Sequence, residues 1–148
     1  MALILDISKT RVIQQHAREA FPEECCGCLL GHMERDQRRV LQVVQVSNTS
    51  SPASRATRFF MDPKDIFAVE DQATRLNMDL IGFYHSHPDG LAEPSPYDLQ
   101  QATWERFSHV ILPVREGSPG DLTSWVLRED RAGFIKESIT IMKSPEAS

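Results

Sequence analysis

The sequence predicts a mixed α/β fold in which a β-sheet lies between helices. Short apolar and β-branched runs indicate strands, and they alternate with longer segments whose apolar residues recur at helical spacing. Such alternation is typical of a sheet that is covered by helices. The 148 residues are 41% apolar and 25% charged, which is ordinary for a single globular domain. We therefore expect one domain over residues 1–143 and a frayed tail over residues 144–148.

Three helices are expected. Residues 8–20 carry apolar side chains at helical spacing, and Pro22 ends that segment. A second helix begins at Pro63, because proline is favoured at the first helical position. A third covers about residues 96–106 and begins after Ser95, which is a good N-cap.

Several short segments have the composition of strands. Residues 80–84 are continuously apolar, which is typical of a strand buried on both faces. Residues 47–58 are rich in Ser, Thr, Asn and Pro and form the most loop-like segment inside the chain. The expected strands cover residues 26–31, 40–46, 58–61, 80–84, 110–114, 122–128 and 134–141.

Charge and hydropathy exclude several classes of protein. The net charge is -5 and no cluster of Lys and Arg is present, so a nucleic-acid surface is not expected. No apolar run has the length of a membrane span, and the N-terminus lacks the basic start of a signal peptide. We therefore expect a cytoplasmic protein. Three cysteines crowded at Cys25, Cys26 and Cys28 make a poor disulfide framework and fit reduced, partly buried thiols.

The chemically informative stretch begins with His85-Ser86-His87-Pro88 and continues to Asp98. Residues i and i+2 of a strand point to the same face, so the imidazoles of His85 and His87 are expected to project together. Two imidazoles and a carboxylate from Asp98, with water in the fourth position, form the ligand pattern of a catalytic zinc. A bare His-x-His pair is more often a solvent-facing loop pair, but the acid that follows a buried strand favours a metal site.

A zinc hydrolase also needs a carboxylate that takes a proton from the attacking water. Glu23 and Glu24 precede the expected strand 26–31, and either can reach the water if that strand lies beside residues 80–84. The spacing does not choose between them. Asp98 has an alternative role as well, since it occupies the N3 position of a helix and would be stabilised there by the helix dipole.

Together these residues resemble the JAMM (MPN+) metallopeptidases. The matching elements are a glutamate, then His-Ser-His-Pro, seven further residues to Ser95 and three more to Asp98. The segment Pro22–Gly31 resembles the bacterial members' Glu-x-Cys-Gly run, and that alignment assigns the catalytic position to Glu24. The resemblance covers about residues 8–130, and the motif does not depart from the family pattern.

The resemblance implies a fold similar to the cytidine deaminases, with a mixed sheet between helices. It implies a zinc ion held by His85, His87 and Asp98, with Glu24 as the catalytic acid–base and Ser95 as a hydrogen-bond donor to the oxyanion. It also implies hydrolysis of a peptide or isopeptide bond at the C-terminus of ubiquitin or a ubiquitin-like protein. The chain resembles the compact bacterial members, which are linked to ubiquitin-like sulfur-carrier proteins that end in Gly-Gly.

Recognition of a Gly-Gly tail is expected to depend on backbone pairing, because the glycines offer no side chain. The expected strand 58–61 could provide the pairing edge beside the site. Arg55 and Arg58 could attract an acidic carrier surface, although the simpler interpretation is two solvated loop arginines.

Three alternatives compete with the peptidase interpretation. A deaminase would need His-x-Glu followed by Pro-Cys-x-x-Cys, but Cys25 and Cys28 precede the histidines and no His-x-Glu begins at His85. The pair Cys25-x-x-Cys28 could instead bind a metal or act in redox chemistry, but it lies in an expected strand, which favours packing. The third alternative is a metal-free scaffold of the same fold. Such copies typically lose ligand residues, and here the ligand set is intact.

Overall fold

The computed structural model describes residues 2–102 and 106–143. In chain order, the elements are β1 (Ala2–Asp6), α1 (Ile7–Ala20), β2 (Cys26–Glu34), β3 (Gln37–Val46), α2 (Pro63–Arg75), β4 (Asp79–Pro88), α3 (Pro96–Gln101), β5 (Ser108–Arg115), β6 (Ser118–Pro119), β7 (Thr123–Leu127) and β8 (Phe134–Met142).

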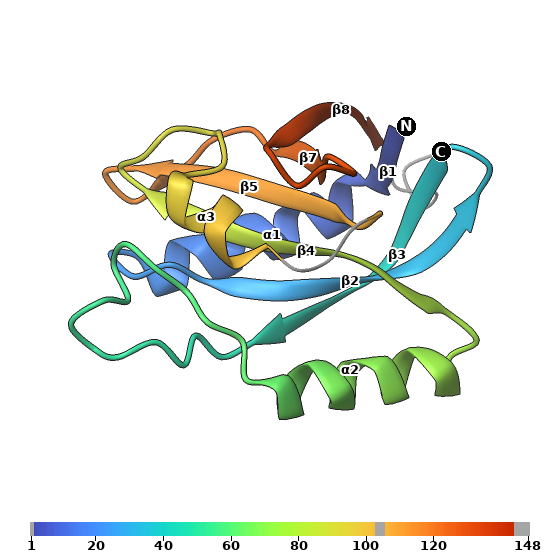
Figure 1. Cartoon of the computed structure of the whole chain (residues 1–148), viewed down its shortest axis with the longest axis horizontal. Helices are drawn as coiled ribbons and strands as arrows, with labels where there is room; N and C mark the ends of the chain where they lie inside the picture. The colour runs from blue at the N-terminus through green and yellow to red at the C-terminus, as the bar shows by residue number, and fades with distance from the viewer. Residues whose placement is uncertain (1, 103–105, 144–148) are drawn as a thin grey trace.

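The strands form one mixed sheet in the order β4-β2-β3-β1-β8-β7-β5-β6 (Figure 1). An additional parallel pairing between β4 and β5 closes this sheet on itself. Strand β4 therefore has a partner on each side, since β2 pairs with it in the antiparallel sense. Residues 81–87 of β4 are all buried, as their continuous apolar character predicts.

Helices α1 and α2 lie on opposite faces of the sheet (Figure 1). Ile13 and Ala17 of α1 join one core cluster together with Leu29 of β2. Val69 and Ala73 of α2 join a second cluster, which contains the neighbours of Leu29 on β2. Because successive residues of a strand point to opposite faces, the two clusters must lie on the two sides of β2. The predicted mixed sheet between helices is confirmed.

Four local predictions differ from the structure. Strands β1 and β6 were not expected. Strand β1 is a short apolar run that forms a strand because it pairs in parallel with β3 and β8, which are distant in the sequence. Residues 58–61 are not a strand, because their hydrogen bonds go to Asn48 and Thr49 on one side only. Helix α3 ends at Gln101 instead of reaching residue 106. The sequence also favours a core position for the large rings of Trp104 and Trp125. Trp104 and the expected tail 144–148 lie outside the described residues.

Within the part of the chain that the structure describes, no helix is long and apolar enough to cross a membrane.

Candidate metal centre

His85 and His87 lie at the end of β4, where the strand period of two places both side chains on one face. Both side chains are buried, and their Nε2 atoms are 2.9 Å apart. Burial lowers the pKa of His85, which favours the neutral imidazole that binds metals. Burial acts on His87 as well, but contacts with Asp98 and with the Leu91 carbonyl raise its pKa.

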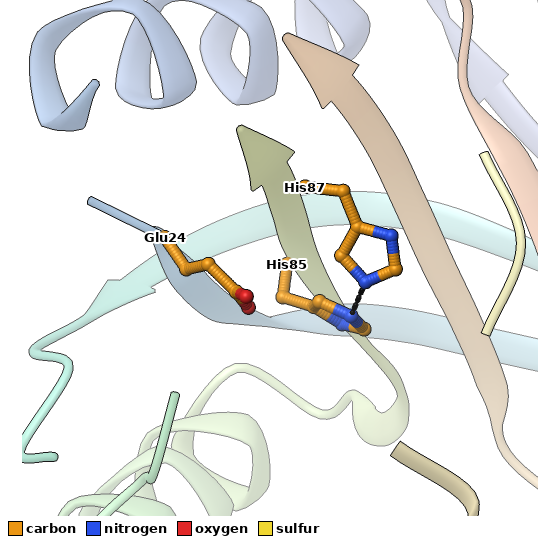
Figure 2. Close-up of side chains that lie close together, drawn as sticks. All are labelled: Glu24, His85 and His87. Atoms are coloured by element: carbon orange, nitrogen blue, oxygen red, sulfur yellow. Dashed lines mark hydrogen bonds between the residues drawn. The ribbon is translucent and has the colours of Figure 1, made fainter. Parts of the chain in front are cut away.

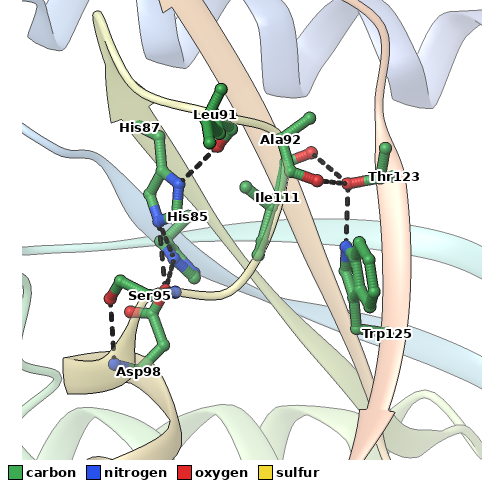
Figure 3. A network of polar contacts seen from close by, with 9 residues as sticks. All are labelled: His85, His87, Leu91, Ala92, Ser95, Asp98, Ile111, Thr123 and Trp125. Atoms are coloured by element: carbon green, nitrogen blue, oxygen red, sulfur yellow. Dashed lines mark hydrogen bonds and ion pairs between the residues drawn. The ribbon is translucent and has the colours of Figure 1, made fainter. Parts of the chain in front are cut away.

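Asp98 reaches the two imidazoles from the first turn of α3 (Figure 3). Its Oδ2 atom lies 3.3 Å from Nε2 of His85 and 3.1 Å from Nε2 of His87. Ser95 begins the helix with a capping box: its Oγ accepts a hydrogen bond from the Asp98 amide, and its amide donates to Asp98 Oδ2. Burial alone would raise the pKa of Asp98, but hydrogen bonds with both histidines hold it well below its ordinary value.

Glu24 lies two residues before the start of β2, and its side chain points towards the two histidines (Figure 2). The β2–β4 register places Cys26 opposite His85, so the strand neighbour that the sequence argument required is present. Side-chain atoms of Glu24, His85 and His87 that can bind a metal lie within 4.8 Å of one another. Glu24 is only 5% exposed, whereas the neighbouring Glu23 is exposed. Glu24, and not Glu23, therefore lies beside the two histidines.

Burial also controls the protonation of Glu24. Removal from water raises the pKa of its carboxyl from 4.5 to about 8; His87 opposes this shift and Asp98 adds to it. Its Oε1 atom is buried without a hydrogen-bond partner among the described residues. Buried polar atoms normally have a hydrogen-bond partner, so packing alone does not explain this oxygen. An unpartnered carboxyl oxygen beside the two imidazoles and the Asp98 carboxylate is typical of a functional site.

The loop between β3 and α2 holds the backbone of Glu24, a role that the sequence analysis missed. The Glu24 amide donates to the Arg55 carbonyl at 2.7 Å, and Asn48 Nδ2 donates to the Glu24 carbonyl at 3.0 Å. Asn48 also binds the segment beside the site, because its Nδ2 donates to the Arg58 carbonyl and its Oδ1 accepts from the Phe60 amide. In the sequence, Asn48 is one of many polar residues in a loop-like segment, and no local pattern indicates its distant partners.

The orientation of His87 is fixed by the loop that follows β4, and that loop is held by β7. Nδ1 of His87 lies 2.7 Å from the Leu91 carbonyl, so a proton on Nδ1 leaves Nε2 free for a metal. The loop that carries Leu91 is fastened by Thr123, which donates to the Ala92 carbonyl at 2.8 Å and accepts from Trp125 Nε1 (Figure 3). Trp125 was expected in the core but is only partly buried.

The three cysteines pack in the interior. Their thiols are free and buried, and burial raises the pKa of Cys25 to about 11 and that of Cys28 to about 12. Within the described residues, the group that could hold a metal contains Glu24 and the histidines but no cysteine. The structure therefore gives no support to a deaminase-like Cys site or to a reactive Cys-x-x-Cys pair.

The other three histidines of the chain and Arg58 lie outside the centre. Nδ1 of His16 lies 2.7 Å from the hydroxyl of Tyr84. His109 packs against Phe134 with ring centroids 5.4 Å apart, and His32 is exposed in β2. The Arg58 guanidinium is not simply solvated, because its Cζ lies 4.4 Å from the centre of the Tyr97 ring on α3.

The donor set fits zinc. Two imidazole nitrogens and a carboxylate oxygen are its usual ligands in hydrolases, and a tetrahedral zinc with bonds of about 2.0–2.1 Å keeps its ligand atoms about 3.3 Å apart. The three atoms of His85, His87 and Asp98 are separated by 2.9, 3.1 and 3.3 Å. These separations are close to those of three zinc ligands, and Glu24 offers a further carboxylate oxygen within 4.8 Å of the ligand atoms of both histidines.

Comparisons with known proteins identify the family of the chain and its fold. A family model for prokaryotic homologues of the JAB domain matches residues 8–128. A desampylase from Haloferax volcanii is 33% identical over 103 residues, which cover 67% of this chain and 71% of that protein. A probable TtuB-protein conjugate cleaving protease from Thermus thermophilus is 35% identical over 95 residues, or 64% of this chain and 58% of that protein. A JAB1/MPN domain protein from Archaeoglobus fulgidus superimposes with a TM-score of 0.58 at 18% identity, covering 95% of this chain and 97% of that chain, and shows a shared fold.

Proposed function

Because the chain belongs to the prokaryotic JAB family, the compact branch of the JAMM/MPN proteins, we propose that it is a zinc-dependent metallo(iso)peptidase. Its substrate is an amide bond after the C-terminal Gly-Gly of a ubiquitin-like or sulfur-carrier protein. The observation that carries this proposal is the convergence of His85, His87 and Asp98 beside the buried, unpartnered carboxylate of Glu24. Similarity to a desampylase and to a protease that cleaves TtuB-protein conjugates supports a hydrolase acting on protein conjugates.

His85, His87 and Asp98 would hold the zinc ion, and Leu91 and Ser95 would fix the orientation of two of these ligands. Bound zinc supplies Lewis-acid activation of the scissile carbonyl and lowers the pKa of a coordinated water towards about 7. Glu24 accepts the proton that the attacking water loses and delivers it to the nitrogen of the leaving amine. Its backbone is held on both sides by Arg55 and Asn48, so the residue that carries the carboxylate is fixed in place before substrate binds.

Ser95 has a second role in this proposal. Its Oγ already accepts the Asp98 amide, which leaves the hydroxyl hydrogen free to donate to the developing oxyanion. Loss of one such donor costs about 3 kcal/mol of transition-state stabilisation in other hydrolases. Ser95→Ala is expected to weaken both the helix cap and the oxyanion contact, whereas Ser95→Thr keeps a hydroxyl for both.

The substrate tail is proposed to pair with the extended segment that includes Phe59 and Met61. This segment uses Arg58 and Phe60 for its bonds to Asn48 and Thr49. Within the described residues, the amides and carbonyls of Phe59 and Met61 have no hydrogen-bond partner. The segment thus has unpaired backbone groups on its other side, as an edge β-strand has, although it does not belong to the sheet.

The test combines metal content with cleavage. The purified protein should bind about one zinc per chain, and it should release the peptide from a carrier protein extended beyond Gly-Gly, read by mass spectrometry. His87→Ala should lose zinc and activity together, while His32→Ala, an exposed histidine on β2, should lose neither. Full zinc occupancy in His87→Ala would show that the ligands are wrongly assigned. Near-zero zinc in the unmodified protein after zinc-replete expression would favour the alternative of a metal-free scaffold.

A further inference from the structure

A pocket of about 160 Å³ opens directly beside the candidate metal centre, and His85 and Asp98 form part of its wall. The rest of the wall is mainly apolar and comes from several elements. Its main apolar members are Phe59, Met61, Ile66, Phe83, Ile111 and Phe134. An apolar cavity of about 150 Å³ holds a benzene ring, so this pocket has room for the side chain of Leu or Phe. The catalytic steps assigned to Glu24 and the zinc ligands do not use this space.

The chemistry of the pocket wall selects against charge. The Phe59 ring stacks on the His85 imidazole with centroids 4.4 Å apart, which turns one face of the site into an aromatic surface. The wall is mainly apolar. An acidic side chain would lose its hydration there without regaining equivalent hydrogen bonds, whereas a neutral apolar one would be favoured by burial.

The open backbone edge borders the same space, because Phe59 and Met61 both line the pocket. A peptide paired with that edge would run along the pocket rim towards the metal centre. On an extended chain, neighbouring side chains point to opposite sides. If a pair of glycines lies at the metal centre, one of the two residues that precede the glycines must direct its side chain towards the pocket wall.

We propose that this pocket is a specificity site for a large apolar side chain, Leu-like or Phe-like, at one of the two positions that precede Gly-Gly in the substrate tail. The proposal rests on the proposed peptidase function and adds a selection that the glycines cannot provide. The protein would then distinguish carriers that share the Gly-Gly ending by the residue just before it.

The test uses the zinc-loaded full chain and carrier proteins extended beyond Gly-Gly by a short peptide. Each of the two positions before the glycines is changed in turn to Leu, Ala or Asp, and kcat/KM is measured for every substrate. At one position, Leu should exceed Ala by about tenfold, in line with what apolar pockets discriminate, and Asp should be cleaved more slowly still. The affinity of the metal-free protein for tail peptides ending in Gly-Gly, measured by fluorescence anisotropy, should follow the same order.

Ile66 on α2 allows the pocket itself to be altered away from the proposed ligands. Ile66→Trp should fill the pocket and reduce the Leu-to-Ala ratio to near one. Ile66→Ala enlarges it and should shift the preference from Leu to Phe, which keeps the proposal testable if the Trp variant folds poorly. Phe67→Trp is the matched control, because Phe67 is the next residue on the same helix and is 76% exposed. Its ratio should stay at the wild-type value.

The outcomes separate the two proposals. Cleavage of every substrate at equal rates, or equal preferences at both positions, would overturn the specificity site and leave the peptidase function standing. A Leu preference that Ile66→Trp and Ile66→Ala both leave unchanged would also overturn it. Failure of the zinc-loaded protein to cleave any Gly-Gly substrate would overturn both.

Discussion

Replacing Glu24 by glutamine should stabilise the metal-free protein, and the gain should depend on pH. The buried carboxyl has a pKa of about 8 in the folded state, compared with an ordinary value of 4.5. Between these two values, the folded protein retains a proton that the unfolded chain has lost, so the folded state loses stability as pH rises through this window. Glutamine has nearly the same shape but does not titrate.

The size of the effect follows from the shift. Each pH unit inside the window is worth about 1.4 kcal/mol, so raising the pH from about 5 to about 8 should favour Glu24→Gln over wild type by about 3 kcal/mol. Urea unfolding of chelator-treated protein at both pH values measures this difference. Glu23→Gln is the control, because Glu23 is exposed and its replacement should change stability by less than about 0.5 kcal/mol at either pH.

The same variant connects stability with turnover. With zinc present, the cation beside Glu24 favours the ionised carboxylate, so the advantage of glutamine at high pH should shrink. Glu24→Gln should keep zinc but lose most of the turnover, since no group remains to carry the proton. Parallel pH curves for metal-free wild type and Glu24→Gln would refute the buried-carboxylate reasoning, and inactivity of Glu23→Gln instead would reassign the base.

Three further predictions concern the surroundings of the site. Asn48→Asp loses the amide donor to the Glu24 carbonyl but keeps its acceptor, so kcat should fall at least about tenfold while zinc content stays unchanged; unaltered kcat would show that the contact does not position Glu24. His16 has its pKa lowered by burial, so below about pH 6.5 the unfolded chain binds the proton more readily, and wild type should lose more stability than His16→Gln between pH 7 and pH 5 in thermal unfolding. Gly27→Ala would place Cβ 2.2 Å from the buried ring of Tyr84 and should cost about 3 kcal/mol in denaturant unfolding, whereas Gly133→Ala, with its nearest neighbour at 3.9 Å, should cost much less.

By itself, the sequence determined the features that depend on short spacing. The strand period of two predicted that His85 and His87 share a face, and the order Ser-Pro-x-Asp predicted a helix that begins after Ser95 with Asp98 in its first turn. The central position of residues 80–84 followed from their continuous apolar character. These properties are local, because neighbouring residues alone decide which way a side chain points along a strand or in the first turn of a helix.

Only the tertiary structure decided which distant groups meet at the site. The β2–β4 pairing brings Glu24 rather than Glu23 to the histidines, and the loop that looked merely flexible holds its backbone through Asn48. Residues 58–61 have strand-like composition, yet their bonds to Asn48 and Thr49 make them an isolated extended edge beside an apolar pocket. Such outcomes depend on partners dozens of residues away and on burial, which sets both the hydrogen bonds a backbone can make and the pKa of a carboxylate.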